Sequence, residues 1–518
     1  MKKRILCVFL VVILALSMVS CNKKENVKTQ SNLEKGVVSY PIETEETLTY
    51  WCELPAQIST EVTNLGDTLF AKNLNEATGI DIKYMHPAQG QGNEVLRLMI
   101  ASGELPDIIQ ANWLAQGPSN CIEQNIILNL NDYIKDYAPN LSEFLKENSD
   151  VKKMIKTDEG DYYVFPFIRN DDVLLVSTGL MLRSDWLKEA GLDVPETIEE
   201  WDTVLAAFKE KCDTPFAMNN YGLFASGFGT FNGSYVDNGE MIFGPIEDGF
   251  KDLVVKLNEW YKKGYIDKNF AIADSKIIKS NILNGISGIT FGAGGSGMGA
   301  YLTEKTNDTF DIAAAPFPVE KKGDKAKFST KELKYSIGGA AITSACKNPE
   351  LAARFLDYGY SDEGHMFYNF GKEGESYNLE NGYPKYAQSI TDTSDGKSMS
   401  QKLTMNCMAG VYGPFVQDKR YIEQYYSTPQ QQDAIKKWSD NTFEKHRVPQ
   451  IIMTMEELNE HSSIMSEINT YVAESFNNFI IGAEPIDNFD KYVKTVKSMG
   501  IDRALEIQQI AYERYLDR

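Results

Sequence analysis

The chain has 518 residues, of which 42% are hydrophobic and 24% charged, so it can bury a large core and is neither disordered nor collagen-like. Its 73 acidic residues against 52 basic ones give a net charge of −21, which repels phosphate backbones, so we expect no nucleic-acid partner. The four histidines lie too far apart for the common His-based zinc motifs, and we predict neither a metal site nor a cofactor.

The N-terminus has the layout of a secretory signal. Three basic residues precede Ile5–Val19, which is apolar except for one serine and is short for a membrane-spanning helix. The ending Met18-Val19-Ser20-Cys21 resembles a bacterial lipobox, although Met stands where Leu is more common. The sequence therefore predicts a signal peptide over 1–20 and a Cys21 acylated on sulfur, as with palmitate. The alternative is an ordinary signal cut nearby that leaves Cys21 free.

A polar stretch follows the lipobox. Asn22–Glu46 shows no apolar periodicity, so we expect a lipidated N-terminus and flexible tether over 21–46 and a folded body from Thr47. No later stretch approaches the length and apolar purity of a membrane span. These features predict an exported protein whose body is held at the outer face of the cytoplasmic membrane by its lipid.

The cysteines of the body are few and far apart. Apart from Cys7 in the signal and Cys21, they are Cys52, Cys121, Cys212, Cys346 and Cys407. Without a Cys-x-x-Cys pair the chain has neither a zinc knuckle nor a dithiol redox motif. We expect mostly buried free thiols, and one or two disulfides remain open for an exported protein.

From Thr47 short apolar strands alternate with amphipathic helices, a pattern typical of a parallel sheet covered by helices. The expected elements are a strand Leu48–Leu54, a helix capped by Asp67 and ended by Gly79, a strand Asp81–Met85, a helix Asn93–Ser102 and a strand from Leu105 to Ile109. Three βα units in about seventy residues are stronger evidence than any single segment.

A second βα region follows. Its expected elements are strands over Tyr162–Phe167, Leu180–Leu182 and Phe216–Asn219, a short helix from Ser184 to Gly191, a helix opened by the capping box Thr197-x-x-Glu200, and helices over Gly249–Lys263 and Ser275–Leu283. Between them, Ser226–Gly244 is rich in Gly, Asn and aromatic residues and lacks a helical period. A long irregular loop of this kind is a candidate for ligand contact.

Strand Ser287–Phe291 leads into Gly292-Ala-Gly-Gly-Ser-Gly297, whose letters match the dinucleotide-binding G-x-G-x-x-G. The acidic residue that should hold the ribose is misplaced, because Asp311 begins the next apolar stretch instead of ending it. We favour a Gly-rich turn that passes close to a ligand or crosses between lobes.

Later segments are mainly helical. Asn348-Pro349 and Thr454-x-x-Glu457 open helices, the second of which ends at Gly482, and a further helix is expected from Asp487 to Gly500. The stretch Thr391–Gly396 partly matches a calcium-binding loop. The expected acidic ligands are out of register and Lys402 stands where the bidentate Glu should be, so we expect no metal there.

Several of these segments resemble the family 1 extracellular solute-binding lipoproteins of Gram-positive bacteria, the capture subunits of sugar-importing ABC transporters, within the oligosaccharide and aldouronate subgroup. The matching segments are Ala101-Ser-Gly-Glu-Leu-Pro-Asp-Ile-Ile109, Leu130-Asn-Asp-Tyr-Ile-Lys-Asp-Tyr-Ala-Pro-Asn140, Leu182-Arg-Ser-Asp-Trp-Leu-Lys-Glu-Ala-Gly-Leu192, Gly371-Lys-Glu-Gly-Glu-Ser-Tyr377 and Ala511-Tyr-Glu-Arg-Tyr515. Segments in this order behind a lipobox span almost all of the mature chain.

The resemblance implies an α/β, two-lobed periplasmic-binding-protein-like fold with hinge crossovers and a ligand cleft between the lobes. We place lobe 1 at 47–161 plus 292–335, lobe 2 at 162–291 plus 336–482, and C-terminal helices at 483–518. Crossings are expected near Tyr162–Asp172, Gly285–Gly292 and Tyr335–Ala340. The implied function is capture of a carbohydrate, by a monomer that is not an enzyme, and its delivery to the permease subunits of an ABC transporter.

We expect ligand contacts in the segments that follow the strands, because ligands in open α/β sheets bind beyond the carboxyl ends of the strands. A sugar needs aromatic rings for its CH faces and paired donors and acceptors for its hydroxyls. The candidate ligand-binding residues are Trp51, Glu53, Trp113, Arg169, Asp171, Phe228, Phe231, Tyr235 and Tyr412.

Each candidate also has a structural interpretation. Trp186 and Trp201 lie on helical faces and are assigned to the core, whereas Trp51 and Trp113 suit either place. Arg169 can pair with a neighbouring aspartate, Asp171 or Asp172, or present its fork to a uronate carboxylate. The alternatives for the whole chain are a lipid-anchored carbohydrate-active enzyme that works with two carboxylates, or the same fold binding a peptide or an amine.

Overall fold

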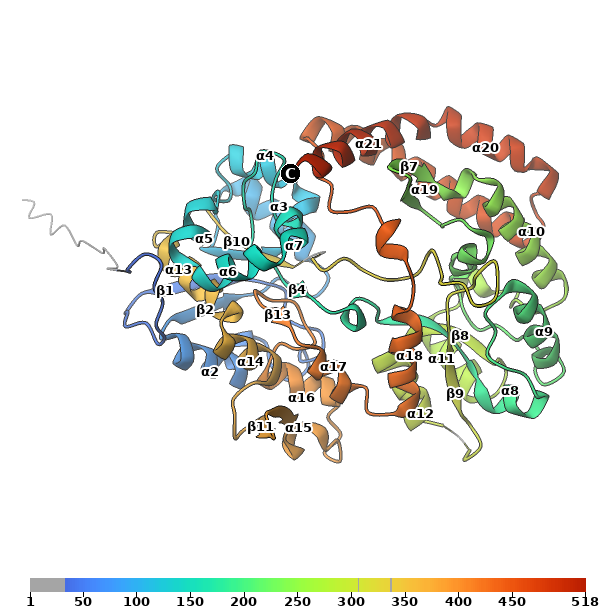
Figure 1. Cartoon of the computed structure of the whole chain (residues 1–518), viewed down its shortest axis with the longest axis horizontal. Helices are drawn as coiled ribbons and strands as arrows, with labels where there is room; N and C mark the ends of the chain where they lie inside the picture. The colour runs from blue at the N-terminus through green and yellow to red at the C-terminus, as the bar shows by residue number, and fades with distance from the viewer. Residues whose placement is uncertain (1–32, 306, 336–337) are drawn as a thin grey trace, which may run out of the picture. The chain divides into compact units, whose positions relative to one another are not determined.

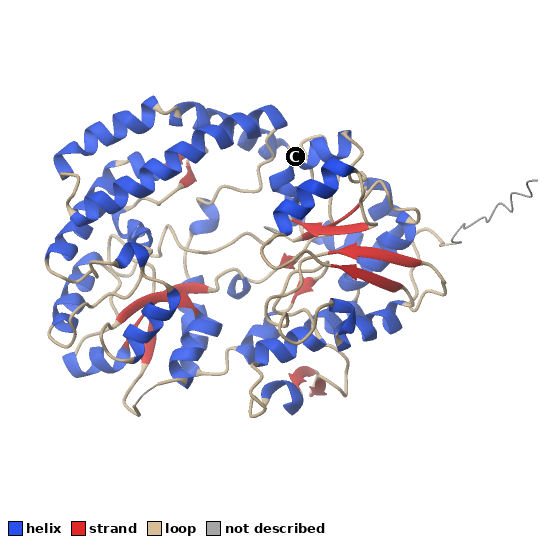
Figure 2. Ribbon diagram, turned by 180° about the vertical axis from the view of Figure 1, so that it is seen from behind, coloured by secondary structure: helices blue, strands red, loops and turns tan. Residues whose placement is uncertain are grey.

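Two β-sheets organise the chain, and each lies at the centre of one lobe (Figures 1 and 2). The computed structural model describes residues 33–305, 307–335 and 338–518, and Glu34–Arg518 groups into one unit. The predicted signal peptide over 1–20 and the predicted lipidation site Cys21 lie outside the described residues. Within the described ranges no helix is long and apolar enough to cross a membrane.

The first lobe contains a four-stranded sheet in the order β10-β3-β1-β2. β1 (Thr47–Trp51), β2 (Asp81–Met85) and β3 (Ile108–Ala111) are parallel, as the repeated βα pattern predicted, and β10 (Gly339–Ile342) is antiparallel to β3. The helices of this lobe are α2 (Leu69–Thr78), α3 (Gly92–Ser102), α4 (Pro118–Glu123), α5 (Asn131–Tyr137), α6 (Pro139–Glu147), α7 (Ser149–Met154), α13 (Pro349–Asp357) and α14 (Asp362–Phe370).

The second lobe contains a three-stranded sheet in the order β8-β5-β9. β8 (Ile289–Ala293) and β9 (Ile312–Ala315) are both antiparallel to the central β5 (Thr178–Arg183). This lobe therefore lacks the parallel arrangement expected from the sequence, because a short apolar run indicates burial but not strand direction. Its helices are α8 (Ser184–Ala190), α9 (Ile198–Lys209), α10 (Asp248–Lys262), α11 (Ser275–Leu283), α12 (Gly299–Thr303), α18 (Pro429–Ser439), α19 (Met455–Ile481), α20 (Phe489–Ser498) and α21 (Ile501–Asp517).

Smaller elements complete the chain. They are the parallel pair β4 (Ile168–Arg169) and β13 (Val416–Gln417), the hairpins β6 (Ser234–Asp237)–β7 (Glu240–Phe243) and β11 (Tyr377–Glu380)–β12 (Tyr383–Tyr386), and helices α15 (Gln388–Thr391), α16 (Met399–Asn406) and α17 (Lys419–Tyr425). The pair β4 and β13 lies where two segments leave the first lobe (Figure 1).

Strand pairing divides the chain differently from the sequence-based boundaries, which placed 292–335 in lobe 1 and 336–482 in lobe 2. β9 pairs with β5 in the second sheet, and β10 pairs with β3 in the first. The chain therefore crosses between β4 and β5, returns between β9 and β10, and crosses again between β13 and α18, which packs on β9. The segment Gly285–Gly292, expected to cross, leads into and forms most of β8 within the second sheet.

The segment before β1, expected to be tether as far as Glu46, packs on the first lobe. The buried guanidinium of Arg354 donates a hydrogen bond to the carbonyl of Glu34, and the Tyr40 hydroxyl donates to the Arg354 carbonyl at 2.6 Å. The Ile42 N–H donates to the Thr78 carbonyl at 2.8 Å. Residues 34–42 therefore belong to the folded body. The polar composition of this segment and its lack of periodicity did not reveal that it is ordered.

Local signals decided several helix ends. Both capping boxes form, at Thr197 for α9 and at Thr454 for α19, and Gly79 ends α2 in the left-handed conformation at φ 74°. The N-cap of α2 is Thr68, not the predicted Asp67, since the Thr68 hydroxyl accepts from the Ala71 N–H. Tyr162–Phe167 forms only isolated bridges, in a segment where Pro166 lacks a backbone donor.

Candidate functional site

A cavity of about 1530 Å³ lies between the two lobes. The first lobe contributes residues at the carboxyl ends of its parallel strands, including Trp51 at the end of β1, Glu53 after β1 and Asn112 after β3. The second lobe contributes the Gly-rich turn that follows β8, including Gly295 and Ser296. Residues between β13 and α18 form a further wall, so all three crossing regions and both sheets position the lining.

Aromatic side chains line one side of this cavity. Tyr421 and Tyr425, one turn apart on α17, stack with ring centroids 5.6 Å apart, and Tyr426 follows directly at 5.8 Å from Tyr425. Trp51 lines the cavity from the end of β1, although only 3% of its surface is exposed. Tyr412 is 42% exposed and packs edge-on against Phe167 at 5.4 Å. Aromatic rings from separate segments of the chain thus line the same cavity.

The Gly-rich turn lets the tyrosines approach. A Cβ atom on Gly295 would lie 2.6 Å from a ring carbon of Tyr425, and one on Gly294 would lie 3.2 Å from the Tyr426 ring. The Gln431 side chain donates a hydrogen bond to the Gly294 carbonyl at 2.9 Å. The glycines therefore serve close packing at the cavity wall.

Amide side chains supply the polar part of the lining. Those in the cavity wall are Gln57, Gln89, Asn93, Gln110, Asn112, Gln417, Gln424 and Gln431. Some are held by the protein: Gln110 accepts from the Tyr50 hydroxyl at 2.7 Å and donates to the Tyr412 carbonyl at 3.2 Å. Within the described chain we find no hydrogen bond from the side chains of Gln57, Asn93 or Asn112. Each of these amides offers a donor and an acceptor to a ligand.

Four charged residues line the cavity: Glu53, Arg169, Glu304 and Lys397. Arg169 forms an ion pair with Glu332, and Lys397 pairs with Glu61 at 2.7 Å. Glu304 pairs with Lys279 at 2.6 Å. Glu53 lies against Gly92 at the start of α3, where a Cβ would come within 1.8 Å of its Oε1. Both lining cations therefore already have a carboxylate partner.

The structure brings together four of the residues proposed from the sequence. Trp51, Glu53, Arg169 and Tyr412 all line the cavity. Arg169 pairs with neither of its neighbouring aspartates but with Glu332, 163 residues away in sequence.

The other proposed residues lie elsewhere. Trp113 is fully buried and its indole N–H donates to the Ile109 carbonyl at 3.2 Å. Asp171 caps a short 3-10 helix at Val173 and pairs with Lys419 at 3.1 Å.

The irregular loop Ser226–Gly244 forms the hairpin β6–β7 and does not reach the cavity lining. Tyr235 is buried and its hydroxyl donates to Glu247 at 2.9 Å, while Phe231 stacks on Phe328 at 5.5 Å. Phe228 borders a separate hollow of about 420 Å³. The predicted irregular loop is therefore largely a short helix end and a hairpin, and its aromatic residues Phe231 and Tyr235 pack in a small core with Phe328 instead of facing the cavity.

The tyrosine run Tyr421–Tyr426 was missed by the sequence analysis. Its signal was present: two tyrosines four residues apart face the same side of a helix, and Thr428-Pro429 with Gln431 opens the next helix immediately afterwards. Aromatic residues between two helix ends near a crossing are well placed to line a cleft.

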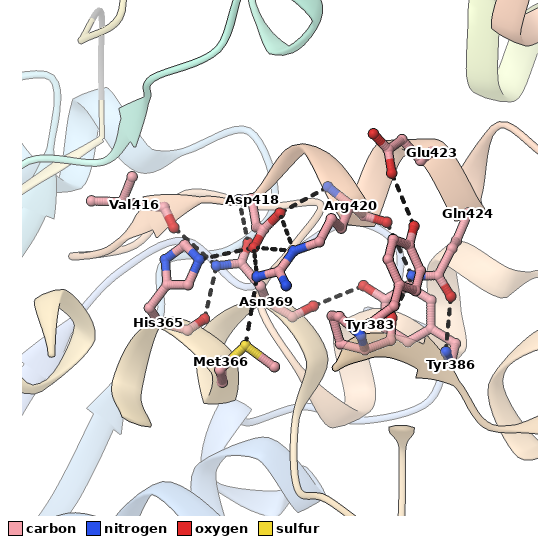
Figure 3. Close-up of polar contacts among 11 residues, drawn as sticks. His365, Met366, Asn369, Tyr383, Tyr386, Val416, Asp418, Arg420, Glu423 and Gln424 are labelled. Carbon is pink, nitrogen blue, oxygen red and sulfur yellow. Dashed lines mark hydrogen bonds and ion pairs between the residues drawn. The ribbon is translucent and has the colours of Figure 1, made fainter. Parts of the chain in front are cut away.

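A polar cluster fixes β13 to α14 beside the cavity (Figure 3). Asp418 accepts hydrogen bonds from His365 Nε2 at 2.9 Å and from the Arg420 guanidinium, whose Nε lies 2.9 Å from Oδ2. Asn369 donates to the carbonyls of His365 and Val416 and accepts from the Asp418 N–H. Burial by itself would raise the pKa of Asp418, but the His365 and Arg420 hydrogen bonds outweigh it and hold that pKa well below its usual value.

We expect Asp418→Asn to lower the free energy of unfolding by about 2 kcal/mol at neutral pH, because His365 and Arg420 lose a charged acceptor. The folded-state pKa is depressed, so the contribution of the carboxylate is complete above its ordinary value of 3.8 and falls as the pH drops below it. The difference from wild type should therefore be complete near pH 5 and shrink below about pH 4. Urea unfolding across pH measures this, with Asp440→Asn at the exposed Lys325 pair as the control. A gap that persists unchanged at pH 3 would contradict the assignment.

Comparisons with known proteins agree with this geometry. Residues 63–366, more than half of the chain, match the family described as bacterial extracellular solute-binding protein. The chain is 24% identical to the fructooligosaccharide ABC transporter substrate-binding protein FusA of Streptococcus pneumoniae, across 96% of this chain and 95% of FusA. It is 26% identical to lipoprotein LipO of Bacillus subtilis, across 60% of this chain and 64% of LipO.

Among solved structures, the alginate-binding protein AlgQ2 without calcium ion superposes with a TM-score of 0.72 at 25% identity, across 92% of this chain and 100% of AlgQ2. The two-lobed fold is thus shared. In residues 33–305, 307–335 and 338–518 no group of three or more His, Cys, Asp or Glu side chains is arranged to hold a metal ion.

Proposed function

The chain belongs to the family of bacterial extracellular solute-binding proteins, and from this membership we propose that it captures a neutral oligosaccharide outside the cell and delivers it to the permease of an ABC transporter. We further propose that a lipid on Cys21 holds the protein, as a monomer, at the outer face of the cytoplasmic membrane. The relative FusA, which is named for fructooligosaccharide, supports sugar capture, and LipO, which is named a lipoprotein, supports the lipid anchor.

One observation carries the ligand class: tyrosine rings and amide side chains line the same interlobe cavity. Aromatic rings pack on the CH faces of a sugar, and amides match its hydroxyls because each provides a donor and an acceptor. A volume of about 1530 Å³ exceeds the range of about 300 to 1,000 Å³ that is usual for a small-molecule pocket, which favours a ligand of several sugar units.

The charges favour a neutral ligand over a uronate. Arg169 is paired with Glu332 and Lys397 with Glu61, so a uronate carboxylate would compete with these carboxylates for both lining cations. Glu53 adds a carboxylate without an ion-pair partner in the described chain, and the whole chain carries a net charge of −21. A bound uronate would place its carboxylate in this negative electrostatic potential, or would have to break one of these two ion pairs.

Capture is coupled to a change of lobe arrangement. A sugar that touches Trp51 in the first lobe and Ser296 in the second favours the arrangement in which both contacts form at once, through its differential affinity for that state. The short segments around β4 and β13 absorb the change, since they carry the chain from one sheet to the other. The arrangement with ligand enclosed is then what a permease recognises.

Calorimetry on the body from Glu34 to Arg518 tests the function. The probes are four neutral tetrasaccharides, namely nystose, xylotetraose, mannotetraose and cellotetraose. Two uronates, tetragalacturonate and an aldotetraouronic acid, serve for comparison. We expect saturable one-to-one binding of at least one neutral sugar and at least tenfold weaker binding of both uronates. Chromatography of the titrated mixtures checks that the sugar stays intact.

Three outcomes would contradict the proposal. Cleaved products at stoichiometric protein would favour a carbohydrate-active enzyme. Binding of peptides or amines with no response to any sugar would keep the fold and remove the ligand class. Tighter binding of a uronate than of every neutral sugar would remove the argument from charge.

A further inference from the structure

An exposed loop between α15 and α16 forms part of the cavity wall. The residues of this region that line the cavity are Thr391, Thr393, Gly396, Lys397, Ser398, Met399 and Ser400. Thr391–Lys397 is exposed along its whole length. An exposed loop of this kind keeps one conformation only if interactions within the loop or with its flanking helices stabilise it.

The side chain of Lys402 supplies such interactions. Its ammonium group lies 3.1 Å from Oδ2 of Asp395 and donates a hydrogen bond to the main-chain carbonyl of Asp392. Only 12% of the Lys402 side chain is exposed, against 51% for Asp395, so the cation sits on the inner side of the loop. From α16, the Lys402 ammonium therefore joins two points of the loop, Asp392 and Asp395.

The two aspartates also bind the backbone of the loop. Asp392 Oδ1 accepts from the Ser394 N–H at 2.8 Å, and Asp395 Oδ1 accepts from the Lys397 N–H at 3.1 Å. The Lys397 N–H and the Lys402 ammonium hold the pKa of Asp395 below its usual value. One oxygen of Asp395 thus orients the cavity-lining backbone at Lys397 while the other holds the cation.

The stretch departs from a calcium loop at several positions, because Thr391 and Thr393 stand where such a loop has acidic ligands. Counted from Thr391, Lys402 stands at the twelfth position, where a calcium loop has its bidentate glutamate. In this chain the residue at that position is itself a cation, so the loop closes by an internal ammonium–carboxylate contact. A divalent ion at the same place would meet the Lys402 charge.

We propose that Lys402 is a positioning residue for ligand capture, whose ammonium joins Asp392 to Asp395 and holds Thr391–Ser400 in the shape that lines the cavity. The part that concerns ligand affinity rests on the proposed function, whereas the part that concerns loop shape stands independently of it. Loss of the cation should leave the loop in several arrangements. If the binding-competent arrangement falls to about a tenth of the population, the Kd rises about tenfold.

Hydrogen–deuterium exchange and calorimetry test this on the body from Glu34 to Arg518. In Lys402→Met and in Asp395→Asn we expect faster exchange at residues 393–400 and an about tenfold higher Kd for whichever of the four neutral tetrasaccharides binds the wild type. Lys402→Arg should restore most of the affinity, and millimolar calcium or EDTA should change neither readout in the wild type. Lys385→Met, which breaks the exposed pair with Glu380, is the matched control and should match the wild type.

Unchanged exchange and affinity in both Lys402→Met and Asp395→Asn would overturn the proposal, as would a calcium-dependent affinity of the wild type. Asp395→Asn keeps the experiment decisive if Lys402→Met does not fold, since Asp395 is half exposed. If the wild type binds no tetrasaccharide, the proposed function fails, and the exchange measurement alone still decides whether Lys402 shapes the loop.

Discussion

Tyr425→Ala weakens oligosaccharide binding by about 30-fold, or about 2 kcal/mol, which is the largest effect on affinity that we expect from one lining residue. The Tyr425 ring lies between Tyr421 and Tyr426 and against the Gly295 backbone, so its removal leaves the centre of the aromatic wall open. Tyr425→Phe keeps the ring and should lose much less. Calorimetry with the tightest-binding neutral tetrasaccharide measures both variants.

The matched control for this prediction is Tyr383→Ala. Tyr383 lies on β12, is partly exposed, and its hydroxyl donates to Glu423 at 2.9 Å, but it does not line the cavity. It should bind sugar as the wild type does. Thermal unfolding without ligand separates lost contact from lost fold. Equal affinities of Tyr425→Ala and Tyr383→Ala would show that the tyrosine run is not a sugar-binding surface.

Asp158→Asn lowers the free energy of unfolding by about 3 kcal/mol, the largest effect on stability that we expect from a polar substitution. Asp158 follows α7 in the first lobe and accepts from Arg514 Nε and Arg518 Nε of the C-terminal segment, each at 2.7 Å. The Arg518 side chain is only 2% exposed and also donates to the carbonyls of Lys156 and Gln450. Removal of the Asp158 charge leaves the guanidinium groups of Arg514 and Arg518 with less neutralising negative charge.

Glu460→Gln provides the comparison for Asp158→Asn. Glu460 pairs with Arg503 at 2.9 Å between α19 and α21, but both side chains are about 40% exposed, so the substitution should cost at most about 1 kcal/mol. Urea unfolding of both variants measures the difference. If both lose the same small amount, the C-terminal helices are not tied to the first lobe through Asp158.

Local and periodic features of the fold could be predicted from the sequence. The bounds of β2 and α11 coincide with those expected, Asp81–Met85 and Ser275–Leu283, because alternating burial and helical periodicity are encoded in adjacent residues. The capping boxes at Thr197 and Thr454 formed for the same reason. The parallel order of β1, β2 and β3 followed from the short βα repeats.

Long-range features could not be predicted in the same way. The partner of β9 is β5, about 130 residues earlier, and no local pattern distinguishes it from the strands of the first lobe. Arg169 pairs with Glu332 and not with its neighbours for the same reason. In the site, Trp51 and Glu53 could be predicted because the carboxyl ends of parallel strands meet at one edge of the sheet. Trp113 also follows a strand at this edge, but its side chain is buried in the core.

A crystal structure of the body with the tightest-binding neutral tetrasaccharide tests the central claim most directly, namely that the sugar is held in the interlobe cavity by aromatic and amide side chains. We predict an intact sugar whose rings pack on Trp51 or Tyr425 and whose hydroxyls bond to Asn93, Asn112 or Gln57, with the Arg169–Glu332 pair unbroken. A sugar bound outside this cavity, for example beside Phe228 at the second hollow, would contradict the account.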